Sequence, residues 1–193
     1  LISSIFVVSA RRFLASMLTY CRRLEFRSSS RVKLEAVMPD PIHIAGKTIG
    51  SGNPVFIIAE VGVNHNGSLD LAKKMIREAA LCGADCVKFQ TFKADRVASL
   101  NAPKANYQLK TTDPEQSQIE MLKALEMRFD QYQEIIQCCN DEGVVFMSTP
   151  YNVEDIDFLE ELHVPAYKLA SMHAAEPWFS ALTAKTGKPV ILS

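Results

Sequence analysis

The stretch that decides the fold reads VFIIA, at residues 55–59. It is a short, uninterrupted apolar run rich in residues that favour β-strands, and it therefore predicts a buried strand. A polar loop follows, in which Ser68 is suited to cap a helix, and apolar residues then recur at helical spacing from Leu69 to Ala79. Gly83 is placed to end that helix. The segment 55–83 thus predicts one strand followed by one helix.

The same alternation recurs along the rest of the chain. Further apolar strands are expected at residues 85–89, 144–147, 166–169 and 189–192. Helices are expected at residues 117–125, 130–141, 153–162 and 177–186, and a long polar stretch, 93–117, follows the second expected strand. Strand–helix alternation with short apolar strands indicates an α/β protein with a parallel sheet.

Two ways of arranging such a sheet compete: a doubly wound open sheet and a (β/α)8 TIM barrel. No GxGxxG motif follows any expected strand, so a dinucleotide-binding fold has no support. A complete barrel needs about 250 residues, whereas about 140 lie between Val55 and Ser193. A barrel would therefore be partial and would contain about the first five strands.

Composition excludes several classes of function. The 193 residues carry 21 basic and 22 acidic side chains, so the chain lacks the overall basic charge typical of nucleic-acid-binding proteins. No apolar run approaches the roughly 20 residues that cross a bilayer. We therefore expect neither a nucleic acid nor a membrane as a partner. Five cysteines without a CxxC pair indicate reduced thiols and a cytoplasmic location.

The first 37 residues differ from the remainder of the chain. They are rich in Arg and Ser and contain only two acidic residues, a composition typical of an organelle targeting segment. The interpretation we favour is that they are extraneous or upstream sequence before a natural start at Met38, and a targeting segment or an ordinary N-terminal extension are the alternatives. We therefore divide the chain into an extension, 1–37, and a barrel portion, 38–193.

Polar side chains gather where the expected strands end, and these ends are where parallel α/β proteins carry their chemistry. They are Glu60 on the first strand, Lys88 and Gln90 on the second, Thr149 after the third, Lys168 and Ser171 at the fourth, and Ser193 after the fifth. Lys88 and Gln90 are two positions apart and so share one face of their strand. Cations together with hydroxyl donors suit a phosphate or carboxylate ligand.

A structural explanation for the strand lysines stays open. A charged side chain within an apolar strand is costly unless it is paired or binds a ligand. Glu60 is an available partner for either lysine in a structural ion pair. Two strand lysines together with hydroxyl groups at three strand ends favour the anion site.

Two other side chains are assigned to structure. His65 shows no ligand spacing with the other histidines, so we expect it to order its loop. Trp178 lies at helical spacing with Leu182, which favours a place in the core.

Five strings of the sequence, in order, resemble the N-acetylneuraminate (sialic acid) synthase family. They are IIAEVGVNHNGS (57–68), GADCVKFQT (83–91), FMSTP (146–150), VPAYK (164–168) and TGKPVILS (186–193). Each string alone is moderately specific, and five in order are a strong match. The resemblance covers about residues 45–193.

The resemblance implies a (β/α)8 barrel transferase that condenses phosphoenolpyruvate with N-acetylmannosamine or a related amino sugar. The product is N-acetylneuraminate or a related acid, and phosphate is released. Carried over position by position, the residues that hold phosphoenolpyruvate are Lys88, Thr149, Lys168, Ser171 and Ser193. Gln90 corresponds to a sugar-side contact and Glu60 to the acidic active-site residue of the first strand. Glu60 and Lys88 are therefore the expected catalytic residues.

The resemblance also implies a divalent metal, Mn²⁺ or Mg²⁺, bound by two histidines of later strands. No metal ligand is therefore expected in this chain. It further implies a homodimer, in which a C-terminal antifreeze-like domain contributes to the partner's active site. Because the later strands and that domain are not in this sequence, the chain resembles a fragment, the front half of such an enzyme, and is expected to be inactive by itself.

The sequence departs from the family pattern directly after Ser171. Many members have Gly and then an acidic residue there, whereas this chain has Met172 and His173. At these two positions the family's local phosphate loop and one sugar-side carboxylate are therefore not matched. Two alternatives to the synthase stay open: another phosphoenolpyruvate-condensing synthase of deoxy-sugar acids, and a non-catalytic binding or interaction module derived from the barrel.

Overall fold

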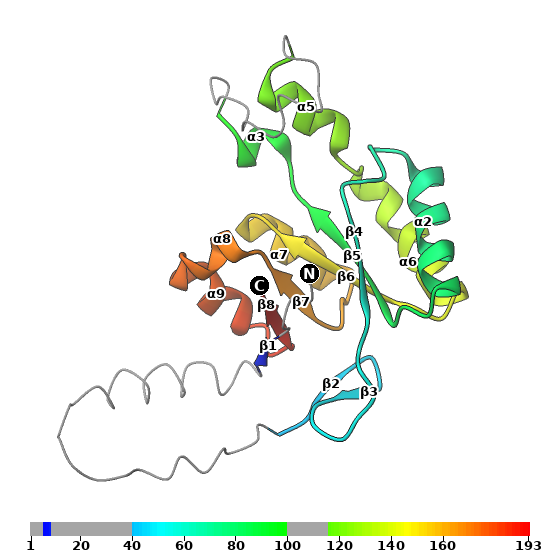
Figure 1. The fold of residues 1–193 in the computed structure, drawn as a ribbon. Coiled ribbons are helices and arrows are strands. Elements are labelled where there is room, and N and C mark those ends of the chain that lie inside the picture. Colours follow the sequence, from blue (N-terminus) through cyan, green and yellow to red (C-terminus); the bar gives the residue numbers. More distant parts are fainter. Residues whose placement is uncertain (1–5, 9–39, 100–115) are drawn as a thin grey trace, which may run out of the picture. The chain divides into compact units, whose positions relative to one another are not determined.

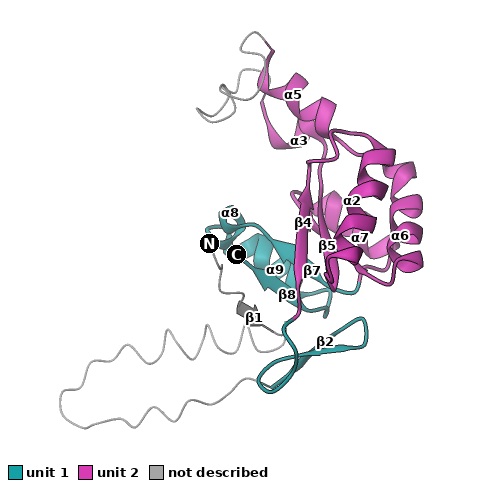
Figure 2. Cartoon of the chain, turned by 45° about the vertical axis from the view of Figure 1, so that its right-hand side comes forward, with its two compact units in different colours: residues 1–55, 165–193 teal, residues 56–164 magenta. Residues whose placement is uncertain are grey.

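The computed structural model describes residues 6–8, 40–99 and 116–193. The chain divides into two compact units, which Figure 2 distinguishes by colour. Unit 2 is the continuous segment Phe56–Val164, and unit 1 combines Leu1–Val55 with Pro165–Ser193. Each unit contributes part of the expected strand–helix alternation.

Unit 2 contains three parallel strands in the order β4 (Ile58–Gly62), β5 (Cys86–Thr91) and β6 (Val145–Pro150). The sheet forms because these segments are apolar and two of them are buried along nearly their whole length. The register places Glu60 opposite Lys88 and Gln90 opposite Thr149. Side chains opposite each other share a face, so these four residues lie on one face of the sheet.

Helices connect the strands of unit 2 (Figure 1). They are α2 (Leu69–Leu81), α3 (Ala94–Val97), α5 (Gln118–Leu125), α6 (Tyr132–Asp141) and α7 (Val153–Glu161), with a 3-10 turn η1 (Phe129–Gln131) before α6. The Ser68 hydroxyl caps α2 by accepting a hydrogen bond from the Leu71 amide at 3.3 Å, as expected. Helices α2 and α6 pack together, and α2, α6 and α7 contact the sheet.

The core of unit 2 lies between the sheet and these helices. Phe89 and Phe146, on neighbouring strands, have ring centroids 5.6 Å apart. Tyr132 of α6 meets Phe146 edge-on, and Phe158 of α7 meets Tyr132 edge-on at 5.2 Å. Edge-to-face aromatic packing adds to the burial of apolar area. These contacts fix α6 and α7 on the face of the sheet that carries Phe89.

Unit 1 contains the parallel strands β7 (Tyr167–Leu169) and β8 (Val190–Leu192). The helices α8 (Ser171–Ala174) and α9 (Pro177–Ala184) follow β7 in the chain. A hairpin of β2 (Ile42–Ile44) and β3 (Lys47–Ile49) belongs to the same unit. Strand β1 (Phe6–Val8) pairs antiparallel with β8, so one described part of the 1–37 extension takes part in a sheet.

The expected α/β class is confirmed, since β4 to β8 each pair in parallel with a neighbour. The first strand was placed three residues too early. Val55 is 81% exposed, and pairing begins only at Ile58 opposite Cys86. The hairpin was missed because its Ala45-Gly46 turn, with both φ angles positive, lacks the Asn-Gly signal typical of such turns.

One further expectation was wrong. Trp178 is 60% exposed, because the buried side of α9 carries Phe179, Ser180, Thr183 and Ala184 instead. The polar stretch 93–117 contains the short helix α3, and its residues 100–115 lie outside the described residues. Within the described part of the chain, no helix is both long and apolar enough to cross a membrane.

Candidate active site

Lys88 and Glu60 form an ion pair across neighbouring strands of unit 2. The Lys88 ammonium lies 2.5 Å from Glu60 Oε2, and the lysine side chain is 7% exposed whereas the glutamate is 57% exposed. The strand register brings the two residues together, since Glu60 is the direct partner of Lys88. This pair offsets the cost of burying the lysine, so burial of Lys88 does not by itself demand a ligand.

Gln90 and Thr149 lie one step nearer the carboxyl ends of their strands. They are register partners, and the Thr149 side chain is buried. Gly62 has φ of +56°, and a Cβ atom added there would lie in ordinary van der Waals contact with Gln90 Nε2, at 3.7 Å. The structure therefore places a lysine, a carboxylate, an amide and a hydroxyl on one face, at the carboxyl ends of three adjacent strands.

The opposite face of the same strand ends carries a buried hydroxyl pair. Thr91 Oγ1 and Ser148 Oγ are 2.7 Å apart, and both side chains are fully buried. The Tyr132 hydroxyl donates to the Gln90 carbonyl at 3.3 Å. Burial raises the pKa of Tyr132 well above its ordinary value, so the phenol keeps the proton that it donates.

His65 orders the loop between β4 and α2, as expected. Its Nδ1 accepts a hydrogen bond from the Gly67 amide at 3.1 Å, and its ring stacks on Phe89 with centroids 5.7 Å apart. Burial lowers the pKa of His65, an effect that a backbone hydrogen bond with Gly62 opposes. The imidazole is therefore held neutral, with Nδ1 unprotonated, as an acceptor within the loop.

In unit 1 the structure brings two other predicted residues together. Lys168 is buried, and its ammonium donates to the Ser193 hydroxyl and, at 3.2 Å, to the Leu169 carbonyl. The backbone completes the contact, since the Ser193 amide donates to the Leu169 carbonyl. Ser171 is exposed and begins α8. Met172, at the first position that departs from the family pattern, is 54% exposed, and His173 is buried.

The predicted set therefore falls into two groups. Unit 2 holds Glu60, Lys88, Gln90 and Thr149, and unit 1 holds Lys168, Ser171 and Ser193. Within each unit the lysine contacts another predicted residue. That both groups form one site remains a prediction.

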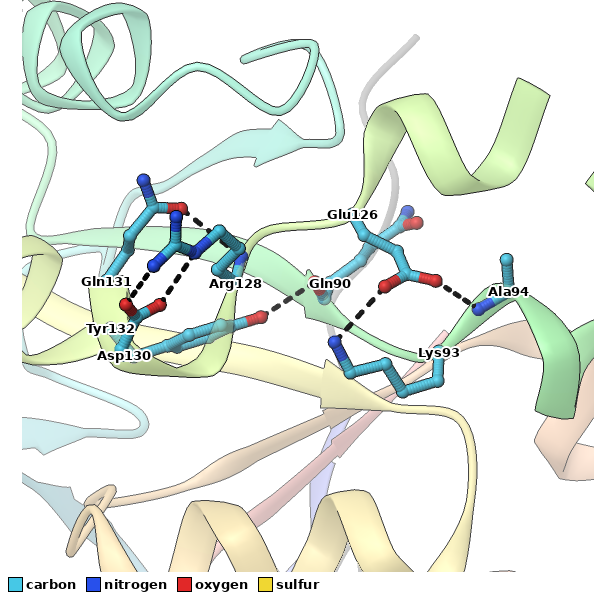
Figure 3. A network of polar contacts seen from close by, with 8 residues as sticks. All are labelled: Gln90, Lys93, Ala94, Glu126, Arg128, Asp130, Gln131 and Tyr132. Carbon is cyan, nitrogen blue, oxygen red and sulfur yellow. Dashed lines mark hydrogen bonds and ion pairs between the residues drawn. The ribbon is translucent and has the colours of Figure 1, made fainter. Parts of the chain in front are cut away.

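A polar cluster that sequence reasoning missed lies at the carboxyl end of β5 (Figure 3). Glu126 accepts from the Lys93 ammonium at 3.1 Å and from the Ala94 amide at 2.6 Å. Lys93 follows β5 directly, whereas Glu126 follows α5, so residues 33 positions apart meet. No periodicity connects them, because the contact depends on the path of the intervening chain.

Metal-binding capacity can be judged for the described residues. They contain no group of three or more His, Cys, Asp or Glu side chains placed to hold a metal ion. No chemical step is therefore assigned to a metal held by these residues, and the divalent metal that the family resemblance implies on later strands remains a prediction. None of the four described cysteines is part of a disulfide among the described residues, and Cys82 alone among the four is exposed.

The fold and the strand ends together define a class of protein. It is an α/β protein with about the first five strands of a (β/α)8 barrel and with polar side chains at the carboxyl ends of these strands. The particular family follows from comparison with known proteins. The chain belongs to the NeuB family, whose model matches residues 75–193.

Several curated relatives are named as synthases of sugar acids. The N,N'-diacetyllegionaminic acid synthase of Campylobacter jejuni is 45% identical over 137 residues, which are 71% of this chain and 41% of the relative. The human N-acetylneuraminate-9-phosphate synthase is 37% identical over 152 residues, which are 77% of this chain and 41% of the relative. The chain thus spans about two fifths of the length of these relatives.

A solved structure shares the fold. The crystal structure of the N-acetylneuraminic acid (sialic acid) synthetase of Leptospira borgpetersenii, in complex with citrate, matches with a TM-score of 0.67 and 30% sequence identity. The match covers 80% of this chain and 50% of that one. The expected partial barrel is therefore confirmed by a family member.

Proposed function

We propose that this chain is the strand 1–5 portion of a phosphoenolpyruvate-dependent synthase of a sialic acid or a related nine-carbon sugar acid. The observation that carries the proposal is the ion pair of buried Lys88 with exposed Glu60, beside Gln90 and Thr149, at the carboxyl ends of three parallel strands. Membership of the NeuB family, with relatives named as synthases of such acids, supports it. N-acetylmannosamine is the proposed sugar.

The reaction forms one carbon–carbon bond and releases phosphate. The methylene carbon of phosphoenolpyruvate attacks the aldehyde carbon of the open-chain sugar, and water adds at the former enol carbon. The bond between that carbon and the phosphate oxygen then breaks. Phosphoenolpyruvate carries two anionic groups, so buried ammonium groups and hydroxyl donors suit its binding.

Each residue of the site has a proposed role. Lys88 and Lys168 offset the charge of phosphoenolpyruvate and orient it. The hydroxyl groups of Thr149, Ser171 and Ser193 donate the remaining hydrogen bonds to the anion. Glu60 is hydrogen-bonded to Lys88 and over half exposed, so it can take up a proton or stabilise positive charge at the former enol carbon. The Gln90 side-chain amide, which can both donate and accept, contacts the sugar.

The test is phosphate release from phosphoenolpyruvate with a panel of amino sugars and Mn²⁺. The assay uses a protein that carries these residues and is as long as the curated relatives. We refer to it below as the full-length protein. We expect release that depends on the sugar, with N-acetylmannosamine compared against precursors of legionaminic and pseudaminic acids. Absence of sugar-dependent release with the whole panel would reject the synthase and favour a binding module.

Three further expectations belong to the same proposal. The 193-residue chain alone should show no turnover, because the resemblance places the metal ligands and the closing strands outside it. The full-length protein should be a homodimer, which its mass in solution tests. A cytoplasmic location remains an expectation, and fractionation of cells tests it.

A further inference from the structure

We propose that Tyr132, together with the Lys93–Glu126 pair, positions Gln90 and thereby controls affinity for the amino sugar rather than for phosphoenolpyruvate. We call these three residues the anchor cluster. The inference rests on the proposed function, because it takes Gln90 as a sugar-side contact. None of the three needs to touch a substrate, since they act on the end of β5, which carries Gln90.

The first anchor acts on Gln90 itself. The Tyr132 hydroxyl reaches the Gln90 carbonyl from α6, as Figure 3 shows. Its ring is buried against Phe146 and Phe158 and so has little freedom to move. A rigid donor on the carbonyl fixes the peptide plane after Gln90. That plane sets the direction in which the Gln90 side chain leaves the strand.

The second anchor acts three and four residues further on. The Glu126 carboxylate contacts both the Lys93 ammonium and the Ala94 amide. It therefore holds the chain just after the end of β5. The Glu126 side chain is 18% exposed and that of Lys93 30%, which keeps water from replacing most of these contacts. A partly buried ion pair with an added backbone hydrogen bond is stronger than an exposed pair.

An aromatic ring joins the two anchors. The Lys93 ammonium lies over the Phe129 ring at 4.4 Å from its centroid, and Phe129 meets Tyr132 edge-on at 6.1 Å. Phe129 also stacks on Phe158 at 4.0 Å. Cation–π and aromatic contacts of this kind each contribute modestly, and together they couple the anchors. The strand end is therefore held at the Gln90 carbonyl and again at Lys93 and Ala94.

The Lys88–Glu60 pair lies earlier on the strand, opposite Met147 rather than Thr149 in the register. The ladder with β6 runs from Cys86 to Thr91 and holds both residues, but Gln90 lies next to the end of the ladder, where the anchor cluster contacts the chain. Loosening the cluster should therefore move Gln90 more than Lys88. This difference predicts an effect on one substrate and not on the other.

The test compares Tyr132→Phe and Glu126→Ala with wild type in the full-length protein. We expect KM for N-acetylmannosamine to rise by about three- to tenfold, the effect of losing one hydrogen bond, with KM for phosphoenolpyruvate changed by less than about twofold. Glu126→Gln keeps an oxygen that can accept from the Ala94 amide, so it should recover part of the sugar affinity.

Matched controls separate positioning from general destabilisation. Thr183→Val removes a buried hydroxyl that bonds within its own helix, to the Phe179 carbonyl. Glu134→Gln removes the charge of an exposed glutamate paired with Lys73. Neither control should change the ratio of the two KM values. Equal rises in both KM values for the anchor variants, or none, would overturn the inference.

A second readout does not depend on turnover. Amide hydrogen exchange of residues 90–94 in the purified 193-residue chain should speed up in Tyr132→Phe and Glu126→Ala and not in the two controls. Unchanged exchange in the anchor variants would overturn the anchoring role. A wild-type protein without synthase activity would instead reject the proposed function, and exchange would then decide the anchoring role alone.

Discussion

The two units support their strand ends to different degrees. In unit 2, strands β5 and β6 each have six residues, and Lys88, Gln90 and Thr149 follow one another along their shared face. In unit 1, strands β7 and β8 each have three residues, and the predicted hydroxyls Ser171 and Ser193 are exposed at or beyond their ends. Unit 2 also has the hydroxyl pair and the anchor cluster behind its strand ends, all of them held by side chains of the same unit.

The difference indicates how the parts of the site are held before a ligand arrives. Groups fixed by a second layer of contacts reach their productive geometry without a further cost in entropy. The polar groups at the strand ends of unit 2 have such a second layer of contacts. The two exposed serines of unit 1 depend on fewer contacts, so we expect a bound anion to order them. Substitutions in unit 2 should therefore have larger effects than hydroxyl substitutions in unit 1.

The largest effect is expected for Lys88→Ala. In the full-length protein it should lower kcat/KM for phosphoenolpyruvate by about 30- to 1,000-fold, because a desolvated charge-assisted contact contributes about 2 to 4 kcal/mol. Lys88→Arg should recover little, since the guanidinium is larger and differently shaped. Steady-state phosphate release measures both variants. Wild-type kinetics in Lys88→Ala would reject the assigned role.

A second large effect concerns the stability of unit 2. Gly67 has φ of +72°, and a Cβ atom there would lie 2.7 Å from the Ala124 carbonyl oxygen. Gly67→Ala should therefore lower the free energy of unfolding by about 2 to 3 kcal/mol, the sum of backbone strain and a clash.

The matched control lies in unit 1. Gly187 has φ of +76° with nothing within 4 Å of its would-be Cβ atom. Gly187→Ala should cost only the backbone strain, about 1 kcal/mol. Urea unfolding of the purified chain measures both. Equal losses for the two glycines would show that the close approach to Ala124 has no energetic weight.

A smaller effect is expected from the exposed hydroxyl of unit 1. Ser193→Ala removes the hydroxyl that contacts Lys168. KM for phosphoenolpyruvate should rise by about three- to tenfold with kcat nearly unchanged, because one hydrogen bond is lost while the lysine remains. A loss as large as that of Lys88→Ala would contradict the contrast between the units.

The smallest effect is a pH dependence of stability. Burial lowers the pKa of His65 in unit 2 and of His173 in unit 1 below the ordinary value of 6.5. At pH values between the pKa of the folded chain and that of the unfolded chain, the unfolded chain binds more protons. The histidines therefore contribute their full stabilisation above about pH 6.5, and the free energy of unfolding falls as the pH is lowered. His65→Gln should flatten this fall in part, as urea midpoints between pH 8 and pH 5 would show. Identical pH profiles for variant and wild type would reject the role of His65.

Much of the fold could be predicted from the sequence because short apolar strands and amphipathic helices alternate with clear end signals. Ser68 and Gly83 bound α2 as expected. The start of β4 could not be predicted, because pairing with Cys86 rather than hydrophobicity decides where that strand begins. Trp178 was misplaced because helical spacing does not say which face of a short helix is buried.

The candidate site could also be predicted in part from the sequence. Lys88 and Gln90 stand out as polar residues within an apolar strand, and their shared face follows from strand geometry. Glu126 contacts Lys93 across 33 positions of the sequence and Tyr132 contacts Gln90 across 42, and no local pattern in the sequence indicates either contact. Supporting residues behind a strand end were therefore the part that needed a structure.

The central prediction of the proposed function is that Lys88 and Lys168 bind the same phosphoenolpyruvate molecule. A crystal structure of the full-length protein with bound phosphoenolpyruvate tests it most directly. We predict its phosphate or carboxylate oxygens within hydrogen-bonding distance of both Lys88 Nζ and Lys168 Nζ, with Thr149, Ser171 and Ser193 facing the same ligand. Lysines on opposite faces of their strands, or phosphoenolpyruvate bound away from both, would contradict the account.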